Sequence, residues 1–481
     1  MVKGARILGV LVSIGVLTCG FSSLSIHPIA QTTGSVEIII GKNVRVSQES
    51  SSFIEASVAA HPDDPNILVI SSSEIIREGM IATSFFSTDG GRTWKHSQLP
   101  EMKEGLNRQD FSHSEDTWTA FAPTGAMYLS ALVPKKVGED RYEAGIWVYR
   151  SSDNGRTWKG PARLAGRHFD RPAIVATSDH VYIESNASGR DAAIVSQPFS
   201  GDIIALLRSD DGANSFKTAS YVVPDNLGHH STNPIVLPDG SLLLAFNDHP
   251  RGTSPLTSSR FYVVQATNKG ERLGLPEFVC DVDRPSVPGN VAVDNSTSQF
   301  RGRVYAVWES GTLMYLNGEN AKSEALSGKT REPSVAYSTN SGLSWSSPVT
   351  FHSENAGPAY YTTIAVNRNG VVGVAWLQHE TRSIERLCYR IYFAASIDGG
   401  KTFTPPRVVS DAVSCPDGSE NLAVIFPPDN HHVTEIWPRG GDYIGLAVTA
   451  DGDFHPVWID GRDGPFQAYT SRVKVIVSET H

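Results

Sequence analysis

The sequence predicts an all-β fold: a β-propeller of four-stranded antiparallel blades. Three observations lead there. An eight-residue string returns at regular intervals along the chain, and the same series of short strands rich in Val, Ile, Tyr and Trp flanks each copy. Gly and Pro, at 42 and 28 of 481 residues, supply many turns. One supersecondary unit repeated at a fixed period is typical of a closed repeat architecture.

The repeated string reads STDGGRTW at 87–94 and SSDNGRTW at 151–158. Further copies begin at Ser209, Ser338 and Ser396, with a degenerate copy, ATNKGERL, at 266–273. Successive copies start 64, 58, 57, 72 and 58 residues apart. At about 62 residues per unit, the stretch 36–478 predicts a single domain of seven blades, with six as the alternative.

Each part of the octamer suits a hairpin between the third and fourth strands of a blade. The Asp (Asp89 in the first copy) can accept backbone N–H bonds, and the Gly after it permits a positive φ. We expect the closing Trp or Phe to pack against its own blade. Six copies cannot be six active sites, so we interpret the octamer as structural.

The last unit has no octamer, and its outer strand is missing from the C-terminal part of the sequence. The segment 37–47, EIIIGKNVRVS, echoes the outer strand PPRVVS of the preceding unit. We therefore expect an N-terminal strand to pair with the last blade, which closes the ring and covers an open edge.

The N-terminus has the pattern of an export signal. Lys3 and Arg6 precede an apolar run at 7–17, and small and polar residues follow. We predict a signal peptide over 1–30 and a secreted or periplasmic protein. Lipidation at Cys19 and an uncleaved N-terminal anchor stay open as alternatives, and no other membrane contact is expected.

Composition excludes several classes of function. A net charge of −10 and a pI of about 5.8 argue against nucleic-acid binding, which needs clustered Lys and Arg. No motif for a metal, a phosphate loop or a cofactor is present, so we expect no cofactor and no metal. We also expect a monomer. In an oxidising compartment, either a Cys388–Cys415 bridge with Cys280 free or three unpaired cysteines fit the spacing.

A candidate site follows from the architecture. In a propeller, the loops that enter the inner strands and those that leave the second strands share one face and surround the axis. The polar residues at these positions suit an anionic or sugar-like ligand. They are Glu55, Glu74, Asp116, Asp170, Arg171, His229, His230, Asn233, Asn247, Asp248, His249, Glu309, Tyr360, Tyr361, His379, Glu380, Arg439, Asp442, Tyr443, Asp460 and Arg462.

The octamer S-x-D-x-G-x-x-W resembles the Asp-box, or BNR repeat, of the sialidase-like β-propellers. In that family three arginines hold a substrate carboxylate, a Tyr activated by a Glu attacks, and an Asp is the acid. FDRPAIV places Arg171 like the first arginine, and GDYIGLAV places Tyr443 like the family Tyr. Asn233 and Asn247 stand where the Glu and a second arginine would be.

The resemblance implies a protein that binds or hydrolyses an acidic glycan at its central face. If it is a hydrolase, we expect Tyr443 as nucleophile or stabiliser and Glu309 or Asp460 as acid/base. A non-catalytic propeller that binds a glycan or protein is the alternative, and a polysaccharide lyase with His230 or His249 as base is a third. The expected substrate-binding residues are Arg171, Arg439, Arg462, His230 and Asp248.

Overall fold

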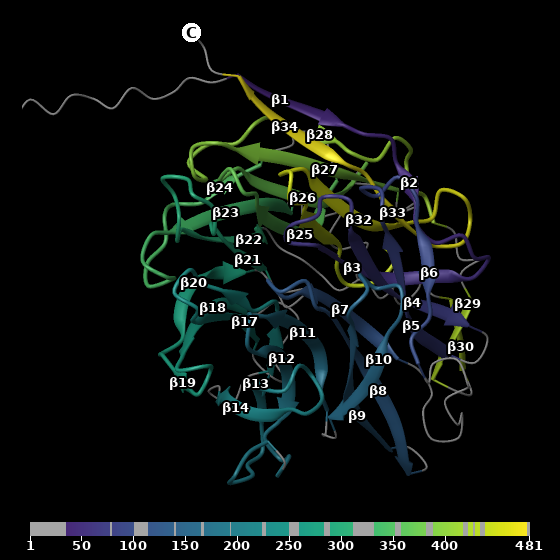
Figure 1. Ribbon diagram of the computed structural model, residues 1–481, viewed down its shortest axis with the longest axis vertical. Coiled ribbons are helices and arrows are strands. Elements are labelled where there is room, and N and C mark those ends of the chain that lie inside the picture. Colours follow the sequence, from purple (N-terminus) through teal and green to yellow (C-terminus); the bar gives the residue numbers. More distant parts are fainter. Residues whose placement is uncertain are drawn as a thin grey trace, which may run out of the picture. The chain divides into compact units, whose positions relative to one another are not determined.

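The computed structural model describes residues 35–478, except for 77–78, 101–113, 139–140, 165–167, 193, 224–227, 250–258, 283–288, 311–330, 352–356, 381–387, 417–421, 427–428 and 433–437. Every regular element in this part of the chain is a β-strand (Figure 1). No helix there is long and apolar enough to cross a membrane. The predicted signal peptide, 1–30 with Cys19, lies outside the described residues.

The strands form seven antiparallel blades, numbered here in chain order, each with its inner strand first. The bounds of the first three blades are as follows. Blade 1 is β3 (Ser52–Ala60), β4 (Leu68–Ile76), β5 (Gly79–Ser87) and β6 (Lys95–Ser97); blade 2 is β7 (Glu115–Phe121), β8 (Met127–Gly138), β9 (Arg141–Ser151) and β10 (Lys159–Leu164); blade 3 is β11 (Asp170–Ala176), β12 (Val181–Ser188), β13 (Asp202–Ser209) and β14 (Lys217–Val222).

In blade 4 the inner and outer strands are each split in two. The bounds of the next three blades are as follows. Blade 4 is β15 (Gly228–Ser231), β16 (Ile235–Val236), β17 (Leu242–His249), β18 (Ser259–Thr267), β19 (Arg272–Leu273) and β20 (Glu277–Val282); blade 5 is β21 (Asn290–Val293), β22 (Val304–Ser310), β23 (Glu332–Ser338) and β24 (Val349–Thr350); blade 6 is β25 (Ala359–Val366), β26 (Val372–His379), β27 (Tyr389–Ser396) and β28 (Arg407–Val408).

Blade 7 is completed by the N-terminal part of the chain, as expected. Its strands β31 (Gly445–Val448), β32 (Phe454–Asp460) and β33 (Gln467–Thr470) are followed by β2 (Val44–Arg45), which pairs with β33. Strand β1 (Ser35–Ile40) pairs with β34 (Val473–Ser478), and the two lie side by side in Figure 1. A separate hairpin, β29 (Leu422–Phe426) and β30 (Asp429–His432), follows blade 6.

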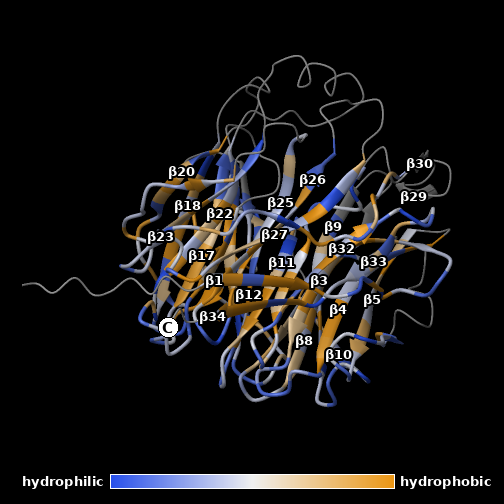
Figure 2. Cartoon of the chain, turned by 90° about the horizontal axis from the view of Figure 1, so that it is seen from above, coloured by the Kyte–Doolittle hydropathy of each residue, from blue (hydrophilic) through white to orange (hydrophobic). Residues whose placement is uncertain are grey.

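The inner strands contact one another in one closed series, β3, β7, β11, β15 and β16, β21, β25, β31 and back to β3. The predicted all-β propeller with seven blades is therefore confirmed, and the alternative of six blades is wrong. Apolar residues fill the interfaces between blades, while Figure 2 shows hydrophilic residues gathered at strand ends and turns. The N-terminal ends of all seven inner strands lie at one end of the propeller axis. We call this end the mouth.

All six octamers lie between the third and fourth strands of blades 1 to 6, as predicted. In blade 2, the Asp153 carboxylate accepts hydrogen bonds from the Ser151 hydroxyl, the Thr157 amide and the Thr157 hydroxyl. Trp158 packs, as expected, with residues of its own blade such as Leu129, and also with residues of blade 1 such as Val69. The indole of Trp158 donates to the hydroxyls of Ser84 and Ser97, so its ring joins blade 2 to blade 1.

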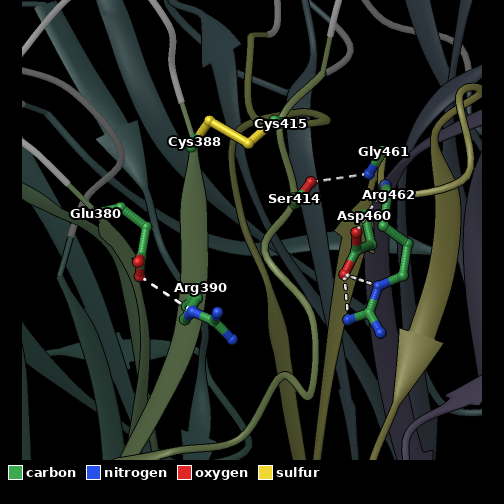
Figure 3. Close-up of a disulfide and its surroundings, with 8 residues drawn as sticks. All are labelled: Glu380, Cys388, Arg390, Ser414, Cys415, Asp460, Gly461 and Arg462. Atoms are coloured by element: carbon green, nitrogen blue, oxygen red, sulfur yellow. Dashed lines mark hydrogen bonds and ion pairs between the residues drawn. A yellow bond between two sulfur atoms is a disulfide. The ribbon is translucent and has the colours of Figure 1, made fainter.

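Cys388 and Cys415 form a disulfide, which decides between the two predicted cysteine states, and Cys280 is free. Figure 3 shows the bridge beside two ion pairs. One joins Glu380 to Arg390, and the other joins Asp460 to Arg462. The bridge ties the start of β27 to the segment that follows β28.

Candidate functional site

Four inner strands carry the same backbone irregularity at the mouth. The register of each with its neighbour shifts once, in β3, β7, β11 and β25. At each shift one residue other than glycine has a positive φ, between 49° and 59°. Such bulges redirect a side chain and gather at functional sites. The four residues are Glu55, Asp116, Arg171 and Tyr361.

A cavity of about 130 Å³ runs along the axis next to these bulges. Three of the polar residues predicted at the central face, Arg171, Asn233 and Tyr443, line its wall. All seven inner strands, or the segments that enter them, contribute to it. The lining residues are Ala56, Ser57, Val58, Trp118, Thr119, Arg171, Ser231, Thr232, Asn233, Asn290, Thr363, Ile364, Tyr443, Ile444, Gly445 and Leu446.

Blades 1, 2, 3 and 7 place an acidic group on one side of the mouth. The Asp116 amide donates to Glu55 Oε2 at 3.3 Å, and Arg171 Nη2 lies 2.8 Å from Asp442 Oδ2. Burial raises the pKa of Glu55 well above its usual range, and the charges of Asp442 and Glu115 add to this. Burial, with Glu55 and Asp170, does the same to the pKa of Asp116. Their surroundings thus shift both carboxyl groups toward the protonated form.

Tyr443 stands between this acidic group and the cavity. Its ring packs on Trp118, with centroids 4.7 Å apart, and its hydroxyl donates to the Thr117 carbonyl at 3.1 Å. Burial, followed by the charges of Glu55 and Asp116, raises its pKa well above 10.0. In this state Tyr443 is a neutral phenol, suited to donating a hydrogen bond.

Two glycines bring the segment that carries Arg439 and Tyr443 to the mouth. A Cβ on Gly440 would lie 2.2 Å from Ile459 Cγ2, and one on Gly441 would lie 2.3 Å from Glu55 Cγ. Both have positive φ, 79° and 114°. The Gly440 carbonyl also accepts the Glu55 amide at 2.9 Å. Any larger residue here would push this segment away from β3.

A basic group occupies the other side of the mouth. The guanidinium of Arg439 lies 3.5 Å above the centre of the Tyr360 ring, and that of Arg331 lies 4.7 Å from it. Arg439 Nε is 2.9 Å from His379 Nε2. Burial, then the charges of Arg439 and Arg331, lowers the pKa of His379 well below 6.5. His379 is therefore neutral, and its Nε2 can accept the bond from Arg439.

Glu309 belongs to the basic group. Its Oε2 lies 3.4 Å from Arg331 Nη2, and its Oε1 accepts the Thr362 amide at 2.7 Å. It is 7% exposed, and Arg331 is 4% exposed. Two guanidinium groups, those of Arg331 and Arg439, lie over the same Tyr360 ring, and planar guanidinium groups suit an anionic ligand.

The structure places other predicted site residues elsewhere. Asp460 is buried, and its carboxylate accepts bonds from Trp458 Nε1 and from the backbone and guanidinium of Arg462. Arg462 also bonds Asp411 and stacks on Tyr469. These contacts form a structural ion-pair network near the disulfide (Figure 3), and neither Asp460 nor Arg462 lines the axial cavity.

Two further predicted residues lie in blade 4. Asp248 accepts the Arg260 amide at 3.0 Å and pairs with its guanidinium at 2.7 Å, within β17 and β18. His230 is half-buried on β15, opposite Asn247 in β17. Neither residue lines the axial cavity. The side chain of His249 lies outside the described part of the chain.

Asn233 holds two inner strands together. Its Oδ1 accepts the Val291 amide at 3.1 Å, and its Nδ2 donates to the Val291 carbonyl at 2.9 Å. The side-chain amide thus bridges blades 4 and 5 as a strand backbone would. At the position where the family resemblance places the activating Glu, this chain has a structural residue.

Sequence reasoning missed Arg331. It considered only the loops that enter first strands and leave second strands, whereas Arg331 immediately precedes the third strand β23. Third strands also begin at the mouth, because neighbouring strands in a blade are antiparallel. A positively charged residue directly before a third strand was the sequence signal that could have identified Arg331.

Within the described ranges, no group of three or more His, Cys, Asp or Glu side chains is placed to hold a metal ion. The chemistry available at the mouth is that of carboxyl, phenol, imidazole and guanidinium groups.

Comparisons with known proteins bear on the family. The model of the BNR/Asp-box repeat matches residues 85–96. A sialidase of Micromonospora viridifaciens is 26% identical over 317 residues, which are 62% of this chain and 41% of that protein. The chain thus spans less than half the length of that relative.

Two solved structures are similar to this chain over most of its length. A Dyadobacter fermentans protein of unknown function is 12% identical and covers 91% of this chain and 99% of its own, with a TM-score of 0.47. An α-L-arabinofuranosidase of Fusarium graminearum is 13% identical and covers 90% and 98%, with a TM-score of 0.44. Neither match bears on activity. The chain is an Asp-box β-propeller, and its repeats and seven blades are consistent with the sialidase-like superfamily.

Proposed function

We propose that this protein is a glycoside hydrolase that acts on an acidic glycan at the mouth of its propeller. The observation that carries the proposal is the pairing of two groups there. A buried carboxyl pair, Glu55 and Asp116, lies on one side, and two guanidinium groups, Arg331 and Arg439, lie on the other. We also propose that the protein is exported by its N-terminal segment.

The roles follow from the surroundings of each group. A carboxyl whose pKa is raised keeps its proton to a higher pH than usual and can protonate a departing sugar oxygen. We assign that role to the Glu55–Asp116 pair in place of Asp460, whose oxygens already bond Trp458 and Arg462. Arg439 and Arg171 bind the substrate carboxylate, since a guanidinium can bond it at two points.

Tyr443 acts beside the sugar ring in this proposal. Its hydroxyl now bonds the Thr117 carbonyl. A ligand that enters the cavity would compete for that hydroxyl, which would then donate to the ligand. Its raised pKa favours a neutral phenol that positions the sugar through a hydrogen bond over a phenolate nucleophile. A water molecule then attacks the anomeric carbon and loses a proton to solvent, while the departing oxygen takes a proton from the Glu55–Asp116 pair. Glu309 keeps Arg331 in place through their ion pair.

A non-catalytic propeller that binds a glycan is the second candidate, and Asn233 favours it. Its side chain is an amide, which cannot deprotonate Tyr443, and both of its polar atoms bond Val291. The two candidates share the same ligand and mouth. They differ in whether the Glu55–Asp116 pair transfers a proton.

Sugar release separates the candidates. The full-length protein is incubated with aryl glycosides and oligosaccharides that end in sialic acid, glucuronate, galacturonate or neutral sugars. Variants Glu55→Gln, Asp116→Asn and Tyr443→Phe test the mouth. Asp248→Asn is the matched control, because this carboxylate is paired with Arg260 within blade 4.

We expect release of an acidic sugar that falls by roughly 10²–10⁴-fold in Glu55→Gln or Asp116→Asn and is unchanged in Asp248→Asn. Ultraviolet absorbance of an unsaturated product would instead identify a lyase. If wild type and variants bind an acidic sugar equally and release none, the binding propeller replaces the hydrolase.

A further inference from the structure

The opposite end of the blades holds a second cavity, of about 390 Å³, between the Asp-boxes of blades 2 and 3. Its walls carry two exposed cations, Arg150 and Lys159. Among the residues that the structure describes, neither has a carboxylate partner. The lining residues are Arg150, Ser152, Lys159, Gly160, Pro161, Ala162, Ala213 and Asn214.

The next interface around the ring, between blades 3 and 4, has the same two cations in the same register. Arg208 directly precedes the box of blade 3, as Arg150 precedes that of blade 2. Lys217 lies opposite Arg208 in the sheet, as Lys159 lies opposite Arg150. Each arginine also reaches a carbonyl at the fourth position of the following box. Arg208 Nη1 donates to Lys269 at 2.7 Å, and Arg150 Nη1 donates to Gly212 at 3.5 Å.

The two interfaces differ in what neutralises these cations. At blade 3, Asp210 lies 2.8 Å from both Arg208 and Lys217, and Glu271 lies 3.0 Å from Arg208. With both carboxylates present, the Arg208 side chain is only 4% exposed. The hydrogen bonds from Lys217 and Arg208 lower the pKa of Asp210 to about 2, which shows how strongly this arrangement holds a carboxylate.

At blade 2 both carboxylates are absent. Counted within the octamer, the position of Asp210 holds Ser152, and the position of Glu271 holds Asn214. Both replacements line the cavity. The cavity is therefore lined by two cations, a hydroxyl and a side-chain amide. The corresponding place between blades 3 and 4 holds two carboxylates that belong to the protein itself.

We propose that this cavity binds an anionic group from outside, a carboxylate or a sulfate, in the place that Asp210 and Glu271 take at the next interface. Arg150 can bond such a group at two points, Lys159 adds a point charge, and the Ser152 hydroxyl adds a donor. The site is separate from the mouth and does not depend on the proposed hydrolase activity.

Thermal unfolding of the full-length protein tests the site, with sodium sulfate, sodium glucuronate and glucose as probes. The response of this site is the rise in midpoint that remains in proteins that also carry Arg439→Gln, since that change weakens the proposed binding of acidic sugars at the mouth. Sodium chloride keeps the ionic strength constant, because screening alone changes stability. A bound anion raises the midpoint as its concentration exceeds Kd. Calorimetric titration then gives Kd for each anion.

Two variants rebuild or remove the site. Ser152→Asp/Asn214→Glu supplies the carboxylates of blade 3 and should raise the midpoint in buffer while abolishing the response to anions. Arg150→Gln should weaken anion binding at least tenfold. The reverse exchange, Asp210→Ser/Glu271→Asn, should create a second responding site between blades 3 and 4. Sugar release at the mouth should be unchanged in all three.

A response to glucuronate alone would identify a sugar carboxylate as the ligand group. A response to sulfate alone would identify an inorganic oxyanion. A response to both would show that the site recognises negative charge and does not distinguish the two groups. The proposal is overturned if neither anion raises the wild-type midpoint above the chloride control. It is also overturned if Ser152→Asp/Asn214→Glu responds as the wild type does.

Discussion

The two ends of the blades use the repeat differently. At the Asp-box end, the first serine of each of five octamers donates to the side chain two residues later, at 2.8 Å in every case. At the mouth, one backbone bulge is repeated in four inner strands, yet it carries a glutamate, an aspartate, an arginine and a tyrosine. The chain keeps its chemistry constant where the fold depends on it and varies it where a ligand could be selected.

The largest expected effect is a loss of sugar release at the mouth without a loss of stability. Glu55→Gln should reduce sugar release by roughly 10²–10⁴-fold, because it removes the proton donor. It should not lower the thermal midpoint at pH 7. The pKa of Glu55 is raised in the folded protein. Its ionisation therefore destabilises the folded state as the pH rises above 4.5, its pKa in the unfolded chain. Circular dichroism melts and the release assay check both, and a large loss of stability would contradict the functional assignment.

Next in size is a pH effect at the junction of blades 7 and 1. His455 is 1% exposed, and among the described residues neither ring nitrogen has a hydrogen-bond partner. Burial, and then Arg472, lowers its pKa from 6.5 to about 4. The unfolded chain therefore binds the proton first, and stability should fall by about 3 kcal/mol as pH drops from 6.5 to 4.

Denaturant titrations across that range check the prediction. His455→Leu should remove this component of the pH dependence, because it leaves no group to protonate between Gly91 and blade 7. An unchanged slope of stability against pH in the variant would show that other groups cause it.

A smaller effect should follow from breaking one Asp-box. Asp153→Ala removes three hydrogen bonds from a half-exposed turn and should destabilise the protein by about 1–2 kcal/mol. Asp153→Asn is the matched control, because blade 5 already has Asn340 at this position with a comparable network. It should cost less than about 1 kcal/mol, and neither change should alter sugar release.

The fold could be predicted because the octamer encodes it locally. Serine, aspartate and glycine form their turn from bonds within eight residues, so each copy marks one hairpin regardless of the rest of the chain. The closing strand was also predictable, since the last unit lacked an outer strand. The partner of Trp158 was not predictable, because it depends on how one blade packs on the one before it.

The site could be predicted only in outline. Strand order brought Glu55, Asp116, Arg171, Arg439 and Tyr443 to one end of the axis, and the structure places them there. Sequence spacing could not reveal the bulges at which four residues adopt a positive φ, and these bulges orient the side chains of those residues. The four are Glu55, Asp116, Arg171 and Tyr361. The spacing of Asp460 and Arg462 in WIDGRDG does favour a salt bridge within a turn, and the structure shows one.

The most direct test of the central claim is the affinity of the mouth for an acidic sugar. We would titrate sialic acid, glucuronate and galacturonate into wild type and Arg439→Gln at constant ionic strength, with glucose as the neutral control. The account predicts that at least one acid binds the wild type and that its Kd rises at least tenfold in the variant. Equal affinity in the two proteins, or no binding of any acid to the wild type, would contradict it.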